Sequence, residues 1–144
     1  MAEAFSRIEN LYLSPELAVR TRFYSEADRT VIGTIRCGVL FVMAFWSGPA
    51  RLAFAELKRV LEGVDPSGRL ELVVVDMDGC PDLCALPEFA GKLHGAGETA
   101  WILGGQIVCT SCLGPHFERF EPYTRQLLDE CTAGPDVAVD RPLD

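Results

Sequence analysis

Basic residues are scarce in this sequence, and they are not grouped. The chain has 13 Lys and Arg residues against 21 Asp and Glu residues, which gives a formal net charge of −8. The positive side chains are scattered along the chain rather than gathered into a stripe. Nucleic-acid-binding proteins and proteins that dock on anionic membranes both need concentrated positive charge. We therefore expect neither nucleic acid nor a membrane as a partner.

Long hydrophobic segments are also missing. The longest apolar run, residues 38–46, is far too short to span a bilayer and instead suits a buried strand. Residues 1–7 do not combine a basic start with a following apolar run, so we expect no signal peptide and a cytoplasmic location. In that setting the six cysteines are expected to be buried thiols, metal ligands or redox groups; they are at positions 37, 80, 84, 109, 112 and 131.

Neither an internal repeat nor a linker divides the chain. Its 144 residues suit a single domain with a sizeable core. Hydrophobic residues make up 49% and charged residues 24%, as in an ordinary globular protein. We expect one domain over residues 1–144, with its core at about residues 10–131. Residues 134–144 are rich in Pro and Asp and poor in apolar side chains, which predicts a loose C-terminal tail.

The hydrophobic pattern predicts an α/β domain. Ser14 and Pro15 are typical of a helix start, and apolar residues continue this predicted helix to Tyr24, whereas residues 30–37 suit either a helix or a strand. The later elements are predicted as a strand at 39–45, a helix from about 47 to 63, a strand at 70–76, a short helix at about 85–93, a hairpin at 100–109 with a two-glycine turn, and a last helix opened by Pro122. A strand–helix–strand unit is parallel and a hairpin is antiparallel, so we expect a central mixed sheet with helices on both faces.

One segment makes a family resemblance specific. Residues 41–51 read FVMAFWSGPAR, which resembles the strand and helix start that carry Trp-Cys-Gly-Pro-Cys-Lys in the thioredoxin family. Downstream, residues 73–76 resemble that family's next strand, which commonly ends in Asp, and residues 102–107 resemble its terminal hairpin. The resemblance covers about residues 10–131 and implies a thioredoxin-like fold.

The chain departs from this family at the residues that carry its chemistry. Thioredoxin chemistry needs a thiolate at a helix N-terminus and a second thiol one turn later, but Ser47 and Ala50 hold these positions. By the same alignment, Phe41 replaces a buried acidic residue, and Gly97 stands near the family's cis-proline. Whether Ser47 and Ala50 are natural or engineered stays open, although the loss of all four features favours a natural lineage.

These departures favour a redox-inactive adaptor or chaperone-like protein that needs no cofactor and whose partner is another protein. The resemblance implies a shallow docking groove around Trp46, Pro49, Gly97 and Glu98, beside the degenerate positions 47–50. An aromatic side chain next to glycines is a plausible protein anchor, and the strand edge at residues 95–99 is expected to be free to pair with an extended partner. The alternative is that Trp46 packs over the hairpin.

Two other functions, both of which would use cysteine side chains, remain open. Cys109 and Cys112 form a CxxC sequence that would suit a thiol–disulfide oxidoreductase if a tight turn brought them together, since an extended chain keeps them about 10 Å apart. With His116, and Cys80 or Cys84 as a fourth ligand, the same pair would suit a small zinc-binding module. Otherwise these residues are simple thiols.

The remaining candidates have structural interpretations. Cys80 and Cys84 are expected to be free thiols, although the turn at Pro81 would allow a reversible disulfide between them. Cys37 and Cys131 are expected to be core thiols.

Overall fold

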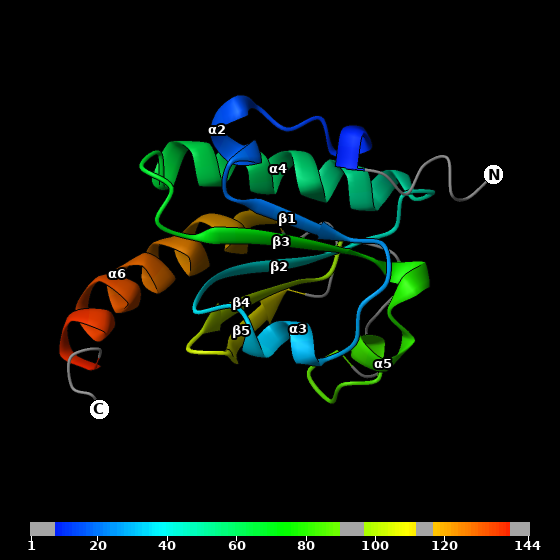
Figure 1. The fold of residues 1–144 in the computed structure, drawn as a ribbon. Coiled ribbons are helices and arrows are strands. Elements are labelled where there is room, and N and C mark those ends of the chain that lie inside the picture. Colours follow the sequence, from blue (N-terminus) through cyan, green and yellow to red (C-terminus); the bar gives the residue numbers. More distant parts are fainter. Residues whose placement is uncertain (1–7, 90–96, 112–116, 139–144) are drawn as a thin grey trace.

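The computed structural model describes residues 8–89, 97–111 and 117–138. Its elements in chain order are η1 (Ile8–Leu11), α2 (Pro15–Ala18), β1 (Thr21–Tyr24), α3 (Thr30–Gly33), β2 (Cys37–Met43), α4 (Gly48–Val64), β3 (Glu71–Asp76), η2 (Met77–Gly79), α5 (Pro81–Cys84), β4 (Thr99–Leu103), β5 (Gln106–Ser111), η3 (Phe117–Arg119) and α6 (Phe120–Ala138) (Figure 1).

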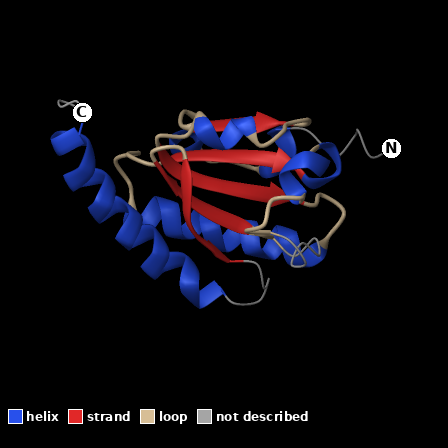
Figure 2. Ribbon diagram, turned by 90° about the horizontal axis from the view of Figure 1, so that it is seen from below, coloured by secondary structure: helices blue, strands red, loops and turns tan. Residues whose placement is uncertain are grey.

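The five strands form one mixed sheet in the order β1-β3-β2-β4-β5. Strands β1, β3 and β2 are parallel, whereas β4 runs antiparallel to β2 and β5 runs antiparallel to β4. Figure 2 shows these strands twisting relative to one another, with the long last helix passing along one side of the molecule. The predicted mixed sheet is confirmed.

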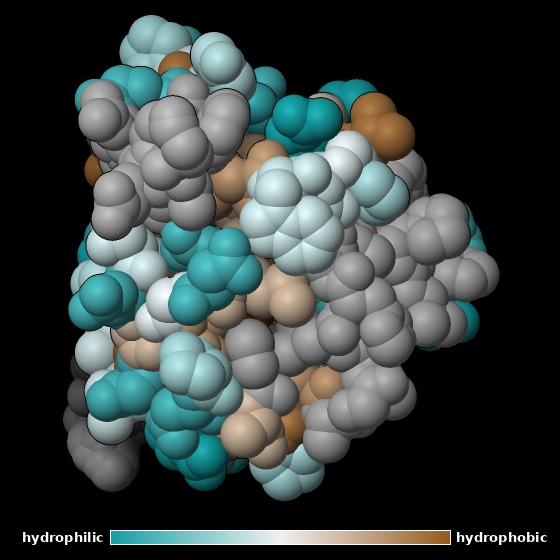
Figure 3. All heavy atoms as spheres, turned by 90° about the vertical axis from the view of Figure 1, so that its right-hand side faces the viewer, coloured by the Kyte–Doolittle hydropathy of each residue, from teal (hydrophilic) through white to brown (hydrophobic). Residues whose placement is uncertain are grey.

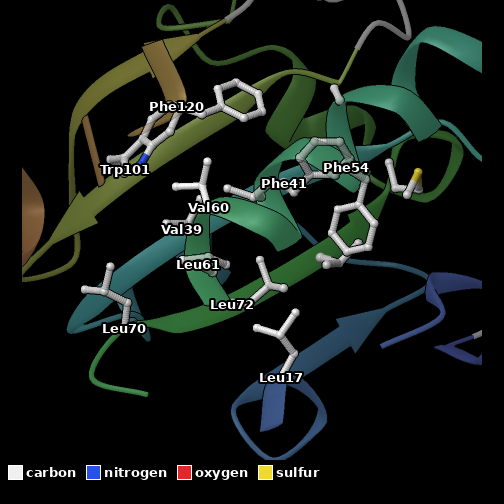
Figure 4. Close-up of a cluster of buried hydrophobic side chains, with 14 of the residues drawn as sticks. Leu17, Val39, Phe41, Phe54, Val60, Leu61, Leu70, Leu72, Trp101 and Phe120 are labelled. Carbon is white, nitrogen blue, oxygen red and sulfur yellow. The ribbon is translucent and has the colours of Figure 1, made fainter. Parts of the chain in front are cut away.

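Helices cover both faces of this sheet and enclose two hydrophobic clusters. On one face, α4 and α6 pack over alternate residues of the central strands, including Val39, Phe41 and Trp101. Figure 4 shows side chains of α4, such as Val60 and Leu61, directed at that face. On the other face, α3 and the segment around α5 cover the intervening residues of the same strands, among them Leu40, Val42, Val73 and Ile102. The predicted layers on both faces are therefore confirmed (Figure 1).

The hairpin between β4 and β5 turns at two glycines. Gly104 and Gly105 have φ angles of 62° and 79°, in the left-handed region that glycine adopts without steric cost. Their N–H groups donate to the carbonyls of Arg36 and Ile35, at 2.6 and 2.9 Å. The turn predicted from sequence is confirmed, and these bonds tie it to the segment that enters β2.

A buried ion pair connects the start of β1 with the turn after α4. The Arg20 guanidinium donates to the Asp65 carboxylate at 2.5 Å, and their side chains are only 7% and 1% exposed. Asp65 also accepts hydrogen bonds from the backbone N–H groups of Arg69 and Leu70, at 3.0 and 2.8 Å. One carboxylate therefore holds both the arginine and the chain that enters β3.

Three sequence predictions need correction. The first helix is only the four-residue α2, because residues 21–24 form the strand β1 and pair with β3. No helix occupies residues 85–89, the described part of the predicted 85–93 helix. The loose tail does not begin at residue 134, because α6 continues to Ala138; residues 139–144 lie outside the described part of the chain. Residues 30–37, left open between helix and strand, contain the helix α3.

Among the residues that the structure describes, none of the helices has the length and apolar character that crossing a bilayer requires.

Candidate functional site

The site lies where β2 leaves the sheet and α4 begins. Ser47 is the N-cap of α4, and its hydroxyl oxygen accepts a hydrogen bond from the N–H of Ala50 at 3.3 Å. Ser47 is 7% exposed and Ala50 is fully buried. The serine hydroxyl thus serves a capping role, and the alanine is part of the core. Neither side chain carries a sulfur that could form or reduce a disulfide.

Phe41 and Gly97, the two other positions at which the sequence differs from the thioredoxin pattern, are both packed in the core. Phe41 is fully buried, with its ring centroid 4.9 Å from that of Phe54 on α4. Gly97 is also buried and has a φ of 89°. A Cβ there would collide with Ala53 and would lie 3.2 Å from the ring of Phe41. The described residues contain no cis peptide bond. The space beneath the first turns of α4 is therefore apolar and closed.

Trp46 is the prominent exposed side chain at this point. Its side chain lies outside the core at 61% exposure, and its indole N–H donates to the Asp78 carboxylate at 3.2 Å. Asp78 is on η2, directly after β3, and its own N–H donates to Asp76 at 3.0 Å. The indole N–H therefore contacts the loop after β3.

The predicted groove needs revision. Pro49 is exposed as expected, but Gly97 is buried and Glu98 is 0% exposed. The described part of the predicted strand edge is not free either, because the carbonyl of Glu98 accepts from the N–H of Val42 at 2.9 Å and Thr99 pairs with both β2 and β5; residues 95 and 96 lie outside the described part of the chain. The accessible part of the site is thus Trp46 and Pro49 on the α4 side. A further apolar side chain near the start of α4, Leu52, is also exposed, at 65%.

An acidic pocket adjoins this surface through Asp78. Its volume is about 590 Å³, and it is lined by Glu26, Ala27, Asp28, Asp78, Gly79, Pro81 and Asp82. Hydrogen bonds from Thr30 lower the pKa of Asp28, and the paired Arg29 guanidinium lowers the pKa of Asp82. Both carboxylates are therefore charged at neutral pH. Within the described ranges, no three Cys, His, Asp or Glu side chains are grouped so that they could hold a metal ion.

The structure describes only part of the alternative cysteine sites. Cys109 is half-buried on β5, and burial, with a smaller contribution from the charge of Glu130, raises the pKa of its thiol to about 11. Cys112 and His116 lie outside the described residues, so the geometry of the predicted CxxC and zinc arrangements is not described. Cys80 is buried with its sulfur 3.7 Å from the Met77 carbonyl oxygen. The side chain of Cys84 also lies outside the described part of the chain.

The prediction that Cys37 and Cys131 are core thiols is wrong in one respect. Both are buried, but the structure joins them as a disulfide with their Cα atoms 6.2 Å apart. Since 94 residues separate them, the sequence carried no local signal of this pairing. Only the fold brings the first residue of β2 against α6.

The high pKa of Cys109 predicts slow alkylation near neutral pH. Because the thiolate is the reactive form, its rate with iodoacetamide should keep rising with pH up to about 11, whereas an ordinary thiol levels off near 9. Peptide mass spectrometry over a pH series measures this rate at Cys109, with the urea-unfolded chain as the control. A rate that already levels off at pH 9 in the folded chain would contradict burial of this thiol.

Neither a protein-family model nor a curated protein matches the sequence. Among solved structures, the chain is similar to a thioredoxin from Trypanosoma brucei brucei, with a TM-score of 0.54 and 14% identity over 75% of this chain and 95% of that chain. It also matches Plasmodium falciparum thioredoxin, with a TM-score of 0.48 and 13% identity over 66% of this chain and 89% of that one. A third match comes from a structure on the thiol resolving mechanism of yeast mitochondrial 1-Cys peroxiredoxin. Its TM-score is 0.47, and the two chains are 18% identical over 66% of this chain and 92% of that one. The sheet order, the helices on both faces and the first of these similarities lead to one conclusion: this chain has the thioredoxin fold.

Proposed function

We propose that this protein is a redox-inactive member of the thioredoxin-like proteins that binds another protein through the surface where α4 begins. The observation that carries this proposal is the contrast between Trp46 and its neighbours. Ser47 and Ala50 are a buried cap and a core residue, whereas Trp46 directly before them is 61% exposed. An indole ring exposed to water costs solvation free energy that a bound partner would recover.

The surroundings of Trp46 favour a small, directed contact. Figure 3 views the side of the molecule on which α4 begins, where hydrophobic residues lie among hydrophilic ones in the part that it colours. The hydrogen bond to Asp78 restricts the indole ring, so less side-chain entropy is lost when a partner contacts it. A restricted aromatic side chain within a polar surround is typical of the residues that dominate a binding interface.

Replacing Trp46 with alanine should weaken partner binding by about 2 kcal/mol or more, which is roughly a 30-fold rise in Kd. The partner is isolated from source cells by crosslinking, and its Kd for each purified variant is then measured by titration calorimetry. Val19→Ala is the matched control, because Val19 is an even more exposed apolar side chain, at 87%, and lies away from this surface on the segment after α2.

A stability measurement accompanies the binding experiment. Trp46→Ala should lower the free energy of unfolding less than Leu57→Ala. Leu57 is a fully buried side chain of α4, and its truncation leaves a cavity. Unchanged binding together with a large loss of stability would show that Trp46 serves the core and that the proposed surface is wrong.

A separate assay tests the proposal that Ser47 and Ala50 carry out no redox chemistry. The protein should not reduce insulin disulfides with a thioredoxin reductase system, because neither Ser47 nor Ala50 can form a mixed disulfide. The double variant Ser47→Cys/Ala50→Cys should form a disulfide but turn over poorly, since Phe41 and Gly97 supply neither an acidic group nor a proline. Wild-type turnover that disappears in Cys109→Ser would instead support the oxidoreductase alternative.

A further inference from the structure

Cys37 and Cys131 lie at a structurally important junction. Cys37 is the first residue of β2, the central strand, and its backbone pairs with Leu103 of β4. Cys131 faces it from α6, and the two residues are 8% and 6% exposed. Their Cα separation of 6.2 Å is within the range that disulfides span without backbone movement.

The junction is separate from the proposed binding surface. Strand β2 starts at Cys37 and ends at Met43, just before Trp46, so the cysteine pair lies at the opposite end of the strand. A thiol pair at this place has no counterpart in the chemistry of residues 47–50. Its redox state instead decides whether β2 and α6 are covalently linked.

The described side chains of α6 contact the sheet at two places. In its first turns, the hydroxyl of Thr124 accepts a hydrogen bond from the indole N–H of Trp101 at 3.0 Å, and the rings of Phe120 and Tyr123 lie 5.7 and 5.1 Å from that of Trp101. Farther along the helix, the side chain of Cys131 is buried in the same cluster as Cys37. The sequence then continues with Gly134 and Pro135, both unfavourable inside a helix.

We infer that Cys37 and Cys131 are a reversible redox pair whose oxidation anchors the second half of α6 to the sheet. The oxidant is a low-molecular-weight disulfide such as oxidised glutathione. One cysteine thiolate attacks this disulfide, forms a mixed disulfide and releases one small thiol. The second cysteine thiolate then displaces the other small thiol. Two protein thiols are oxidised to one disulfide, and one small disulfide is reduced to two thiols, so protons and electrons balance.

The anchor should be strong because it closes a long loop. A disulfide across 94 residues removes much of the conformational freedom of the unfolded chain. Without it, the helix around Cys131 loses its covalent link to β2, whereas the first turns keep their contacts with Trp101. Reduction should therefore loosen the second half of the helix before the rest of the domain unfolds.

The test changes the redox state of the wild-type chain in buffers of reduced and oxidised glutathione. Peptide mass spectrometry of the oxidised protein should find the peptide with Cys37 linked to the peptide with Cys131. Reduction should lower Tm by about 10 °C. It should also speed amide hydrogen exchange at residues 127–131 at least tenfold, while exchange in the middle of α4 changes much less.

Variants separate this pair from the other cysteines. Cys37→Ala and Cys131→Ala should each abolish the glutathione-dependent shift in Tm, whereas Cys109→Ser should retain it. The inference is overturned if Cys37 and Cys131 stay reduced at every glutathione ratio, or if the link forms and exchange in α6 does not change. Since the readouts are Tm and exchange in α6, a failure here is distinguishable from a failure of the binding experiment on Trp46.

Discussion

Replacing Asp65 with alanine should lower the free energy of unfolding by about 3–5 kcal/mol. The carboxylate is 1% exposed, pairs with Arg20 at 2.5 Å and accepts from two backbone N–H groups. Its removal leaves the arginine charge buried, with only the more distant carbonyl oxygens of Leu61 and Leu70, both at 3.4 Å, as acceptors. Urea unfolding followed by circular dichroism measures the loss.

An exposed ion pair provides the control for this variant. Arg125 and Glu121 pair along α6 at 2.8 Å, with side chains 61% and 44% exposed. Because water solvates both charges, Glu121→Ala should change the free energy of unfolding by less than about 1 kcal/mol. If Asp65→Ala costs no more than Glu121→Ala, the buried pair does not hold β1 to the turn before β3.

Replacing Gly97 with alanine should lower the free energy of unfolding by about 3 kcal/mol or more. Two independent penalties add at this position. The φ of 89° is unfavourable for any residue with a Cβ, at about 1–3 kcal/mol. The new methyl group would also collide with Ala53 on α4, and overpacking a closed core typically costs about 1–3 kcal/mol. Restoring a proline at this position should be worse, since its ring requires a φ near −65°.

Gly33→Ala is the matched control for the glycine variant. Gly33 is on α3, its φ is not in the left-handed region, and a Cβ there would meet nothing within 4 Å. Alanine should therefore leave the free energy of unfolding unchanged or raise it by about 0.5–1 kcal/mol. Thermal and urea unfolding of both variants give the comparison. Equal stabilities would contradict the tight approach of Gly97 to α4.

The central elements of the fold were predictable from local patterns. The short, continuous apolar run before Trp46 favours a strand covered on both faces, and β2 is buried along its whole length. The Ser-Gly-Pro sequence that follows combines a cap with a proline suited to a first helical turn, and α4 begins there. Two glycines between apolar runs predicted the hairpin turn. In each case the deciding interactions lie within a few residues of one another.

Long-range effects account for the errors. Residues 21–24 have apolar positions that fit a helix as well as a strand, and their pairing with β3, some 50 residues away, decides in favour of β1. Leu52 is as apolar as the residues on the buried face of α4, yet it is 65% exposed. The contact of Cys37 with Cys131 likewise depends on where α6 crosses the sheet.

The candidate site was predictable in part for the same reason. That positions 47 and 50 hold serine and alanine rather than cysteine can be read directly from the sequence. The burial of Gly97 and Glu98 could not, since Gly97 packs against Ala53 and Phe41 from other elements, and β4, which follows Glu98, is an inner strand rather than an edge. An inner strand has partners on both sides, so its backbone has no free edge for a bound peptide.

The chain has two tryptophans, and the fold places them in opposite surroundings. Trp46 is 61% exposed at the end of β2, whereas Trp101 is fully buried under α6. The fluorescence of the two tryptophans therefore reports on two different parts of the molecule. A water-soluble quencher such as acrylamide reaches the first indole and not the second, so quenching of the folded protein reports on Trp46. In a Trp46→Phe variant, the remaining emission follows the docking of α6 alone, without an added dye or label.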